Sequence, residues 1–375
     1  MRRSRPLAVY CGPFDGGSTA KIAARLANAF AERGYPTDLL VTASRGPIPE
    51  PTVPGVRVVD MGAMAALVRI PAMALYLRRR HPVAVLTHRI REDLFTLKAA
   101  RLVAPTTPVF VTVHGPLGVK LDHVPGAKGQ RRRAEILRWY PRNRGIVAIS
   151  EETAADVRGL LGPGAPVTVI PNPIVTPQML QAAEAPLDHP WFCPGSPPVL
   201  VFAGRLEREK DLPTLLRAFA ILRQGVDCRL LIIGDGKLRP QVESELNALD
   251  LCDSVELPGW AANPYPFLKR AALVVLSSVW DALPTVLIEA LALGRPVVST
   301  DCGAGPREIL DGGRYGPLVP PRDPEALAAA LARTLADPLP RETLIQGGRR
   351  YEVGRNADLY LRLLLGSGDG GANVA

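Results

Sequence analysis

Cysteine is scarce in this sequence, and the few cysteines are scattered. The five are Cys11, Cys193, Cys228, Cys252 and Cys302, and no two of them form a CxxC pair. An odd, dispersed set argues against a disulfide framework and against a structural zinc site. We therefore expect a reduced, cytoplasmic protein without a zinc site.

Long apolar runs are also missing. The start, MRRSRPLAVYCGPF, has the basic head of a signal peptide, but its apolar run from Leu7 to Cys11 is too short and stops at Gly12-Pro13. The nearest candidate for a membrane span, Met61 to Leu77, contains Arg69 and Pro71, whereas a span needs about 20 apolar residues. We expect no segment that crosses a membrane.

Lysine is rare, since only 7 of the 45 basic residues are Lys. The basic residues are also unevenly distributed along the chain. Residues 1–190 hold 25 basic and 14 acidic residues, a net of +11, whereas residues 191–375 hold 20 and 22, a net of −2. A basic half is typical of a protein with an anionic partner, such as nucleic acid, an acidic membrane or a phosphate-bearing substrate. An arginine-rich composition would also scatter these charges over any surface, so both interpretations stay open.

Strand and helix patterns alternate twice along the 375 residues, which is long enough for two domains. This alternation predicts the α/β class with two parallel sheets in tandem. Ligands of such sheets bind beyond the carboxyl ends of the strands. We expect a first domain over 1–175, a proline-rich linker over 176–197, a second domain over 198–353 and a flexible tail over 368–375.

Two loops at predicted strand ends are candidates for phosphate binding. GPFDGGST has Ser18 where a P-loop needs Lys, but its glycines still allow a backbone to approach a phosphate. In FAGRLEREKDLP, Arg205 follows a strand directly and Lys210 precedes a helix that begins near Pro213. Two cations at this edge suit a diphosphate. A tight turn and two solvated charges are the alternatives.

The stretch SSVWDALPTVLIEALALGRPVVST, residues 277–300, carries two acids in apolar surroundings. Glu289 lies in a helix that is apolar on nearly all sides, which predicts a buried helix. A buried carboxylate is costly unless it is paired, and the hydroxyls of a ligand such as a ribose would satisfy it. A backbone N–H or an arginine of the core would do the same. Asp281, before the helix, also suits the helix dipole.

Histidines end two predicted strands, and one metal signature is missing. His114 ends VFVTVH and His88 ends VAVLTH, so both lie at the ligand edge of the first sheet, with His114 the stronger candidate. Alone, either would more often be structural. No DxD triplet occurs in the chain, which argues against a diphosphate held by metal.

Taken together and in order, these residues resemble the retaining glycosyltransferases of family 4. The resemblance implies the GT-B architecture, with two Rossmann-like parallel-sheet domains that face each other across a cleft. It covers nearly the whole chain and is most specific over 199–330. It rests on DGGS, ERGY, VTVHG, VAISEET, VIPNPI, FAGRLEREKDLPTLLRAF, IIGDGKLR, LPGW, SSVWDALPTVLIEALALGRPVVSTDCGAGPREIL and GGRYGPLVPPRDPEALAAAL.

The resemblance implies roles for both acids and both cations of the second half. Arg205 and Lys210 would hold the donor's diphosphate, and Glu289 would bind the ribose hydroxyls. Asp281 occupies the first acid of the family's E-x7-E signature, where the family usually has Glu, and would reach the donor sugar. The backbone N–H groups of Thr285 and Val286 would meet a phosphate.

Further roles fall on the first half. Gly16 and Gly17 would let the first domain approach the same phosphates, and His114 would lie beside the anomeric carbon. The family's last helix, here about 354–367, would pack back on the first domain.

These roles imply a retaining glycosyltransferase that moves a sugar from a nucleoside diphosphate, such as a UDP-hexose or UDP-N-acetylhexosamine, to a glycan or lipid-linked acceptor. Bacterial surface-glycan assembly is the implied setting, with no cofactor and no metal. The alternatives are a nucleotide-sugar epimerase of the same architecture, a basic nucleic-acid-binding protein and a glycosidase that uses the two acids. We expect no nucleic-acid partner.

The segment KGQRRRAEILRWYPRNR, residues 128–144, concentrates arginines with Ile136, Leu137, Trp139 and Tyr140 between them. Such a segment suits peripheral contact with an anionic membrane, here the inner face of the cell membrane. A solvated helix is the alternative.

Overall fold

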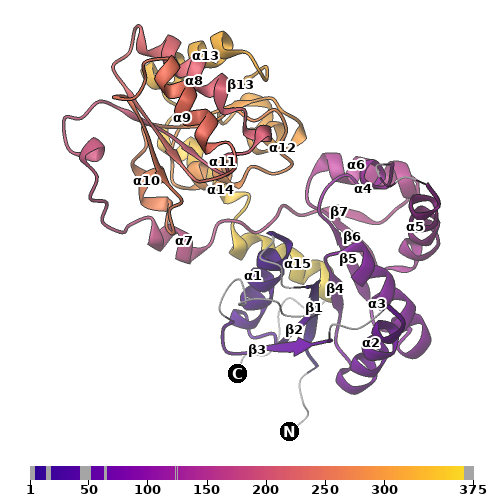
Figure 1. Cartoon of the computed structure of the whole chain (residues 1–375). Coiled ribbons are helices and arrows are strands. Elements are labelled where there is room, and N and C mark those ends of the chain that lie inside the picture. Colours follow the sequence, from indigo (N-terminus) through magenta and orange to yellow (C-terminus); the bar gives the residue numbers. More distant parts are fainter. Residues whose placement is uncertain are drawn as a thin grey trace. The chain divides into compact units, whose positions relative to one another are not determined.

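The computed structural model describes residues 5–13, 18–42, 52–62, 66–122, 124 and 126–366, without the side chains of 66, 67 and 119. The chain folds into two compact units, and it passes between them twice. The first unit contains residues 1–173 and 353–375, and the second contains residues 174–352. Each unit is a sheet with helices packed around it (Figure 1).

The sheet of the first unit has the strand order β3-β2-β1-β4-β5-β6-β7, and its pairings are parallel. The order runs outward from β1 in both directions, so β1 and β4 flank a topological switch point. Ligands of open α/β sheets bind at the carboxyl edge of such a point. The strands are β1 (Leu7–Gly12), β2 (Thr37–Val41), β3 (Val56–Asp60), β4 (Val85–Thr87), β5 (Val109–Val113), β6 (Gly145–Ala148) and β7 (Val167–Val169).

Helices cover this sheet because each carries an apolar stripe. In α1, Ile22, Leu26 and Phe30 recur every four residues and are at most 2% exposed. They share one apolar cluster with Tyr360 of the last helix, α15, which therefore packs within the first unit. The helices are α1 (Ser18–Glu32), α2 (Ala66–Arg80), α3 (Ile90–Val103), α4 (Leu117–Asp122), α5 (Gly126–Trp139), α6 (Glu151–Leu161) and α15 (Val353–Leu365), with a 3-10 turn η1 (Tyr140–Arg142).

The sheet of the second unit has the order β10-β9-β8-β11-β12-β13, again with parallel pairings. Here the order reverses between β8 and β11, which places the second switch point at the carboxyl ends of these two strands. The strands are β8 (Val199–Ala203), β9 (Arg229–Ile233), β10 (Val255–Gly259), β11 (Leu273–Leu276), β12 (Val297–Thr300) and β13 (Leu318–Val319).

Eight helices and three 3-10 turns of the second unit lie within the described residues. The apolar faces of the helices cover both sides of the sheet, in two separate clusters. The helices are α7 (Pro177–Ala182), α8 (Leu212–Arg223), α9 (Arg239–Ala248), α10 (Tyr265–Arg270), α11 (Thr285–Ala292), α12 (Ala304–Ile309), α13 (Pro324–Ala336) and α14 (Arg341–Arg349), and the turns are η2 (Pro190–Phe192), η3 (Arg208–Lys210) and η4 (Asp311–Gly313).

The segment 176–197 differs from the linker that the sequence suggested, because it belongs to the second unit. Thr176 caps α7 by accepting a hydrogen bond from the backbone N–H of Met179, whose side chain is 4% exposed in the core. Asn263 donates to the carbonyl of Ala182 at 2.9 Å. The proline-rich composition therefore did not indicate the short helix α7, which packs within the second unit. The expected tail, 368–375, lies outside the described residues.

Candidate functional site

The loops that follow β8 and β11 meet at the switch point of the second unit. Ser277, directly after β11, donates a hydrogen bond from Oγ to the backbone carbonyl of Lys210 at 2.7 Å. The backbone N–H of Val279 donates to the carbonyl of Glu209 at 2.8 Å. These two bonds attach the 3-10 turn η3, which carries Lys210, to the loop that carries Asp281.

Lys210 and Asp281 are bonded to each other. The Nζ of Lys210 donates to Oδ2 of Asp281 at 2.5 Å, and the two side chains are only 14% and 17% exposed. The sequence predicted both residues for the donor site, and the structure brings them into one ion pair. In a partly desolvated setting such a pair holds both side chains in a fixed geometry.

Arg205 is not part of this pair. Its side chain is 77% exposed, and its Nη2 lies 3.4 Å from Oε1 of Glu209, at the long end of a hydrogen bond. The guanidinium therefore lies on the solvent side of the same loop. It has the freedom to turn toward an anion, whereas Lys210 is already held.

Two glycines allow the β8 loop to lie where it does. At Gly234, φ is +141°, and an added Cβ would lie 1.9 Å from the carbonyl oxygen of Gly204. At Gly236 it would lie 2.4 Å from the carbonyl oxygen of Leu206. Only glycine permits this close backbone approach. Gly234 and Gly236, in the segment GDGK of residues 234–237, thus have a structural role in placing the loop that carries Arg205.

Helix α11 begins at Thr285, with Pro284 as its N-cap residue. The first amides of a helix have no acceptor within it, and in the described part of the chain no side chain caps this end. The N–H groups of Thr285 and Val286 are therefore available to an anion, which the helix dipole also favours.

The prediction that α11 is buried on nearly all sides is wrong along one stripe. Thr285, Glu289 and Ala292 are half-buried, while Val286 to Ile288 and the pair Ala290–Leu291 are buried. The spacing of four and then three residues places the half-buried residues on one face. Glu289 is therefore half-buried on this face of the helix and not fully enclosed in the core.

In the first unit, the two strand-end histidines are hydrogen-bonded to each other. Nδ1 of His88 lies 3.0 Å from Nε2 of His114, and the rings stack with centroids 5.3 Å apart. Burial lowers the pKa of His114 to about 3, with further lowering by Lys120 and Arg89. Burial also holds the pKa of His88 well below its usual value. Both rings are therefore neutral near pH 7, and one nitrogen of the pair donates to the other.

A cavity of about 560 Å³ opens beside these histidines, where α1, α3 and α4 meet the carboxyl ends of β4 and β5. It lies at the switch point of the first unit. Its wall includes Asp93, which is 1% exposed and accepts a hydrogen bond from Tyr140 Oη at 2.7 Å. Burial raises the pKa of Asp93 to about 8, so this carboxyl is mostly protonated at neutral pH.

Four lining residues were not predicted for this edge, namely Asp93, Lys120, Arg132 and Tyr140. Arg132 and Tyr140 lie in the segment 128–144, which the sequence suggested for membrane contact instead. The local signal for Asp93 was the acid pair after the strand that ends at His88, and acids in the first turn of a helix ordinarily serve its dipole. Gly16 and Gly17, predicted for this edge, lie outside the described residues.

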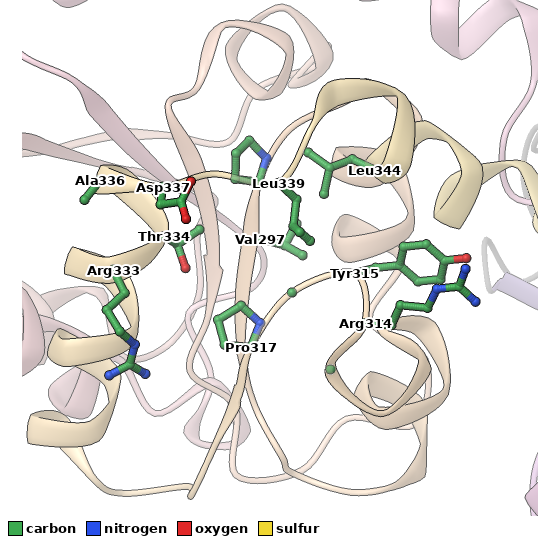
Figure 2. Close-up of a pocket in the computed structure, with 13 residues that line it drawn as sticks. Val297, Arg314, Tyr315, Pro317, Arg333, Thr334, Ala336, Asp337, Leu339 and Leu344 are labelled. Atoms are coloured by element: carbon green, nitrogen blue, oxygen red, sulfur yellow. The ribbon is translucent and has the colours of Figure 1, made fainter.

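A second cavity, of about 490 Å³, lies in the second unit at the opposite edge of the sheet. Figure 2 shows Arg333, Thr334 and Asp337 at the end of α13 on one side of it, and Arg314 with Tyr315 on the other. Pro296 and Val297 bring the amino end of β12 to its wall. It contains no residue that the sequence predicted for the site.

The described residues contain no group of three or more His, Cys, Asp or Glu side chains placed to hold a metal ion. Their helices include none with the length and apolar character needed to cross a membrane.

Comparison with known families assigns both halves of the chain. Residues 197–337 match the family described as Glycosyl transferases group 1, and residues 19–177 match the one described as Glycosyltransferase Family 4. The two matches follow each other in the order of the two sheets.

Curated relatives give the same result. An uncharacterized glycosyltransferase of Methanocaldococcus jannaschii is 37% identical over 146 residues, which are 38% of this chain and 36% of that protein. The lipopolysaccharide core biosynthesis glycosyltransferase LpsE of Rhizobium meliloti is 31% identical over 60% of this chain and 65% of its own length. The 2-deoxystreptamine glucosyltransferase of Streptomyces kanamyceticus is 28% identical over 84% of both chains. The chain spans only 22–39% of the length of the first three relatives.

Solved structures share the fold over nearly the whole chain. The apo lipopolysaccharide outer core galactosyltransferase WaaB superposes with a TM-score of 0.72 at 17% identity, covering 96% of this chain and 99% of that one. Anabaena HepE in complex with UDP superposes with a TM-score of 0.71, at the same identity and coverage. With two parallel-sheet units, two family matches in order and relatives that are glycosyltransferases, this chain belongs to the group 1, family 4 glycosyltransferases of GT-B fold.

Proposed function

We propose that the protein transfers a sugar from a UDP-hexose or UDP-N-acetylhexosamine to a glycan or lipid-linked acceptor, with retention of anomeric configuration. Bacterial surface-glycan assembly, at the cytoplasmic face of the membrane, is the proposed setting. The lipopolysaccharide core relative and the fold shared with a protein crystallised with UDP support this choice.

The observation that carries the donor proposal is the ion pair at the second switch point. Lys210 is fixed by Asp281 at the edge where α/β sheets bind ligands, and the uncapped start of α11 follows in the same loop. A diphosphate placed here meets a positioned ammonium and free backbone N–H groups. Arg205 supplies a second cation from the solvent side.

These groups act where charge develops. As the bond from the anomeric carbon to the diphosphate oxygen breaks, negative charge grows on the leaving diphosphate. Lys210, Arg205 and the N–H groups of Thr285 and Val286 stabilise that charge more than they stabilise the bound donor. Because these groups supply the positive charge, the proposal needs no metal ion.

The two acids hold hydroxyls of the donor at different places. Glu289, on the half-buried stripe of α11, binds the ribose, and Asp281 binds the donor sugar through the oxygen that Lys210 does not occupy. The acceptor hydroxyl attacks the face that the diphosphate leaves, which forms the new glycosidic bond with retention. Its proton passes to an oxygen of the departing phosphate.

The first unit supplies the acceptor side in this proposal. His114 is neutral near pH 7 and is held by His88, so it contributes a dipole beside the anomeric carbon rather than a charge. No side chain is assigned as a nucleophile.

A panel of nucleotide sugars tests the donor proposal. UDP and the preferred UDP-sugar should raise the melting temperature of the full chain by mass action, while ADP and GDP sugars should do so less. The anomeric coupling constant of the transfer product, measured by NMR, then tests retention. An inverted product would contradict the retaining mechanism, and conversion of the donor without any acceptor would indicate an epimerase instead.

A further inference from the structure

A histidine that lines the cavity of the first unit has a buried polar atom without a partner. His88 is 2% exposed, and its Nε2 has no hydrogen-bond partner among the described residues. The other nitrogen, Nδ1, is bonded to His114. An unsatisfied buried polar atom costs free energy, so its position on the wall of a cavity points to a hydroxyl of a ligand.

Two cations on the same wall, Lys120 and Arg132, form no ion pair within the described residues. The Nζ of Lys120 donates to the backbone carbonyl of His114 at 2.9 Å, and in the described part of the chain it has no carboxylate within ion-pair distance. Arg132, from α5, has neither an ion pair nor a side-chain hydrogen bond there. An ammonium has three donors and a guanidinium five, so most of this capacity remains available.

The acids around the cavity are already engaged. Glu92 accepts from Arg91 at 3.2 Å and from Arg69 at 3.5 Å. Asp93 is mostly protonated because burial raises its pKa to about 8. The neighbouring carboxylate of Asp156 accepts from the backbone N–H of Gly118 at 2.8 Å.

The acids on the helices that carry the two cations are engaged as well. Asp122 of α4 pairs with Arg133 at 2.7 Å, and Glu135 of α5 pairs with Lys98 at 2.5 Å. Asp156 acts on Lys120 from a distance and raises its pKa, while burial lowers it. No acid forms an ion pair with Lys120 or Arg132 in the described part of the chain, so their charge is at most partly compensated.

We propose that this cavity binds the acceptor through an anionic phosphate ester, held by Lys120 and Arg132, with a neighbouring hydroxyl hydrogen-bonded to His88 Nε2. A guanidinium and an ammonium together suit a phosphate. The guanidinium can donate two parallel hydrogen bonds to it, and the ammonium supplies a compact positive charge. The volume of about 560 Å³ is that of a small-molecule site. This inference rests on the proposed glycosyl transfer and names the chemical class of its acceptor.

The test is a calorimetric titration of the full chain with saturating UDP, which blocks the diphosphate site of the second unit. One arm uses glycerol 1-phosphate, with glycerol as the uncharged comparison. The other uses dihexanoyl-phosphatidylglycerol as soluble monomers, which presents the phosphate of a lipid headgroup. The variants are Lys120→Ala and Arg132→Gln, and Arg78→Gln on α2 is the matched control, because it removes an exposed charge of the same unit.

We expect at least one phosphate ester to bind, and Lys120→Ala and Arg132→Gln each to weaken it tenfold or more, while Arg78→Gln changes it less than twofold. Tighter binding of glycerol 1-phosphate would identify a soluble phosphate ester, and tighter binding of the lipid a headgroup. Binding of neither ester, or binding that both variants leave within twofold, would overturn the inference.

The UDP titration, read separately, reports on the proposed donor site. If UDP itself fails to bind, the donor proposal fails, and the same phosphate titrations without UDP still decide the question of the acceptor.

Discussion

Lys210 and Asp281, 71 positions apart in the sequence, form an ion pair with 2.5 Å between Nζ and Oδ2. The two side chains expected to contact the donor are thus bonded to each other. Aspartate is one methylene shorter than the glutamate that the family resemblance would place here. In the proposed function, the oxygen of Asp281 that Lys210 does not engage binds a sugar hydroxyl.

Removal of Lys210 should therefore impair transfer more than it impairs the fold. We expect Lys210→Ala to lower kcat by about 10²–10³, as for the loss of one group that stabilises a developing anion, and Arg205→Ala to do so to a similar order. Arg208→Ala is the control, because this exposed residue lies on the same turn. Steady-state kinetics measure the effect. A folded Lys210→Ala enzyme with unchanged kcat would contradict the proposal that Lys210 stabilises the leaving diphosphate.

The two acids of residues 277–300 should differ in kinetic effect. Glu289→Ala should mainly raise the donor KM, because a ribose contact is similar in ground and transition states. Asp281→Ala should mainly lower kcat, because it removes a contact to the reacting sugar and also releases Lys210. The comparison uses initial rates over a range of donor concentrations. If both variants raise KM equally and leave kcat unchanged, Asp281 only positions the start of α11.

Asp93 should make stability depend on pH. Burial raises its pKa to about 8 in the folded state, against about 3.9 when unfolded. Between these two pKa values, Asp93 is protonated in the folded state and ionised in the unfolded state. Its contribution to the free energy of unfolding is therefore full below about pH 4 and declines as the pH rises to about 8. Asp93→Asn keeps the shape without the titration. The free energy of unfolding of wild type relative to this variant, from urea titrations, should fall from pH 5 to pH 8, and a constant difference would contradict the burial argument.

Metal chelation should leave activity nearly intact. The diphosphate charge is assigned to Lys210, Arg205 and the start of α11, so EDTA has no required ion to remove in the proposed mechanism. Transfer rates before and after treatment with EDTA test this, with added Mg²⁺ as the comparison. An absolute requirement for Mg²⁺ or Mn²⁺ would contradict the proposed charge assignment.

Membrane contact through α5 should depend on its arginines rather than on a broad apolar face. Ile136 is fully buried and Tyr140 is 1% exposed, whereas Leu137 is 44% exposed, so two of the four apolar residues between the arginines point into the unit. We expect flotation with phosphatidylglycerol vesicles to fall with added salt. Arg131→Gln combined with Arg138→Gln should weaken it by about 1 kcal/mol for each charge. Equal flotation with neutral vesicles would exclude this mode of contact.

Local patterns in the sequence account for much of the fold. Apolar strands alternating with amphipathic helices predicted two parallel sheets, because these periods follow from backbone geometry and need no distant partner. The family resemblance placed Lys210, Asp281 and Glu289 in the donor half for a similar reason, since each lies in a contiguous and specific motif. The sequence shows the glycines of GDGK, residues 234–237, but it did not predict their close contact with the loop after β8.

Other features depend on residues that are distant in sequence and meet only in the fold. The protonation of Asp93 follows from its burial beside Tyr140, 47 positions away, and the bond between His88 and His114 follows from the pairing of β4 with β5. The open stripe of α11 depends on which neighbours cover the helix, and its sequence alone indicated burial. The sequence by itself determined which residues carry charge and how the chain alternates. The tertiary structure decided which charges are cancelled, which are buried and which remain for a ligand, because desolvation and pairing depend on distances across the fold.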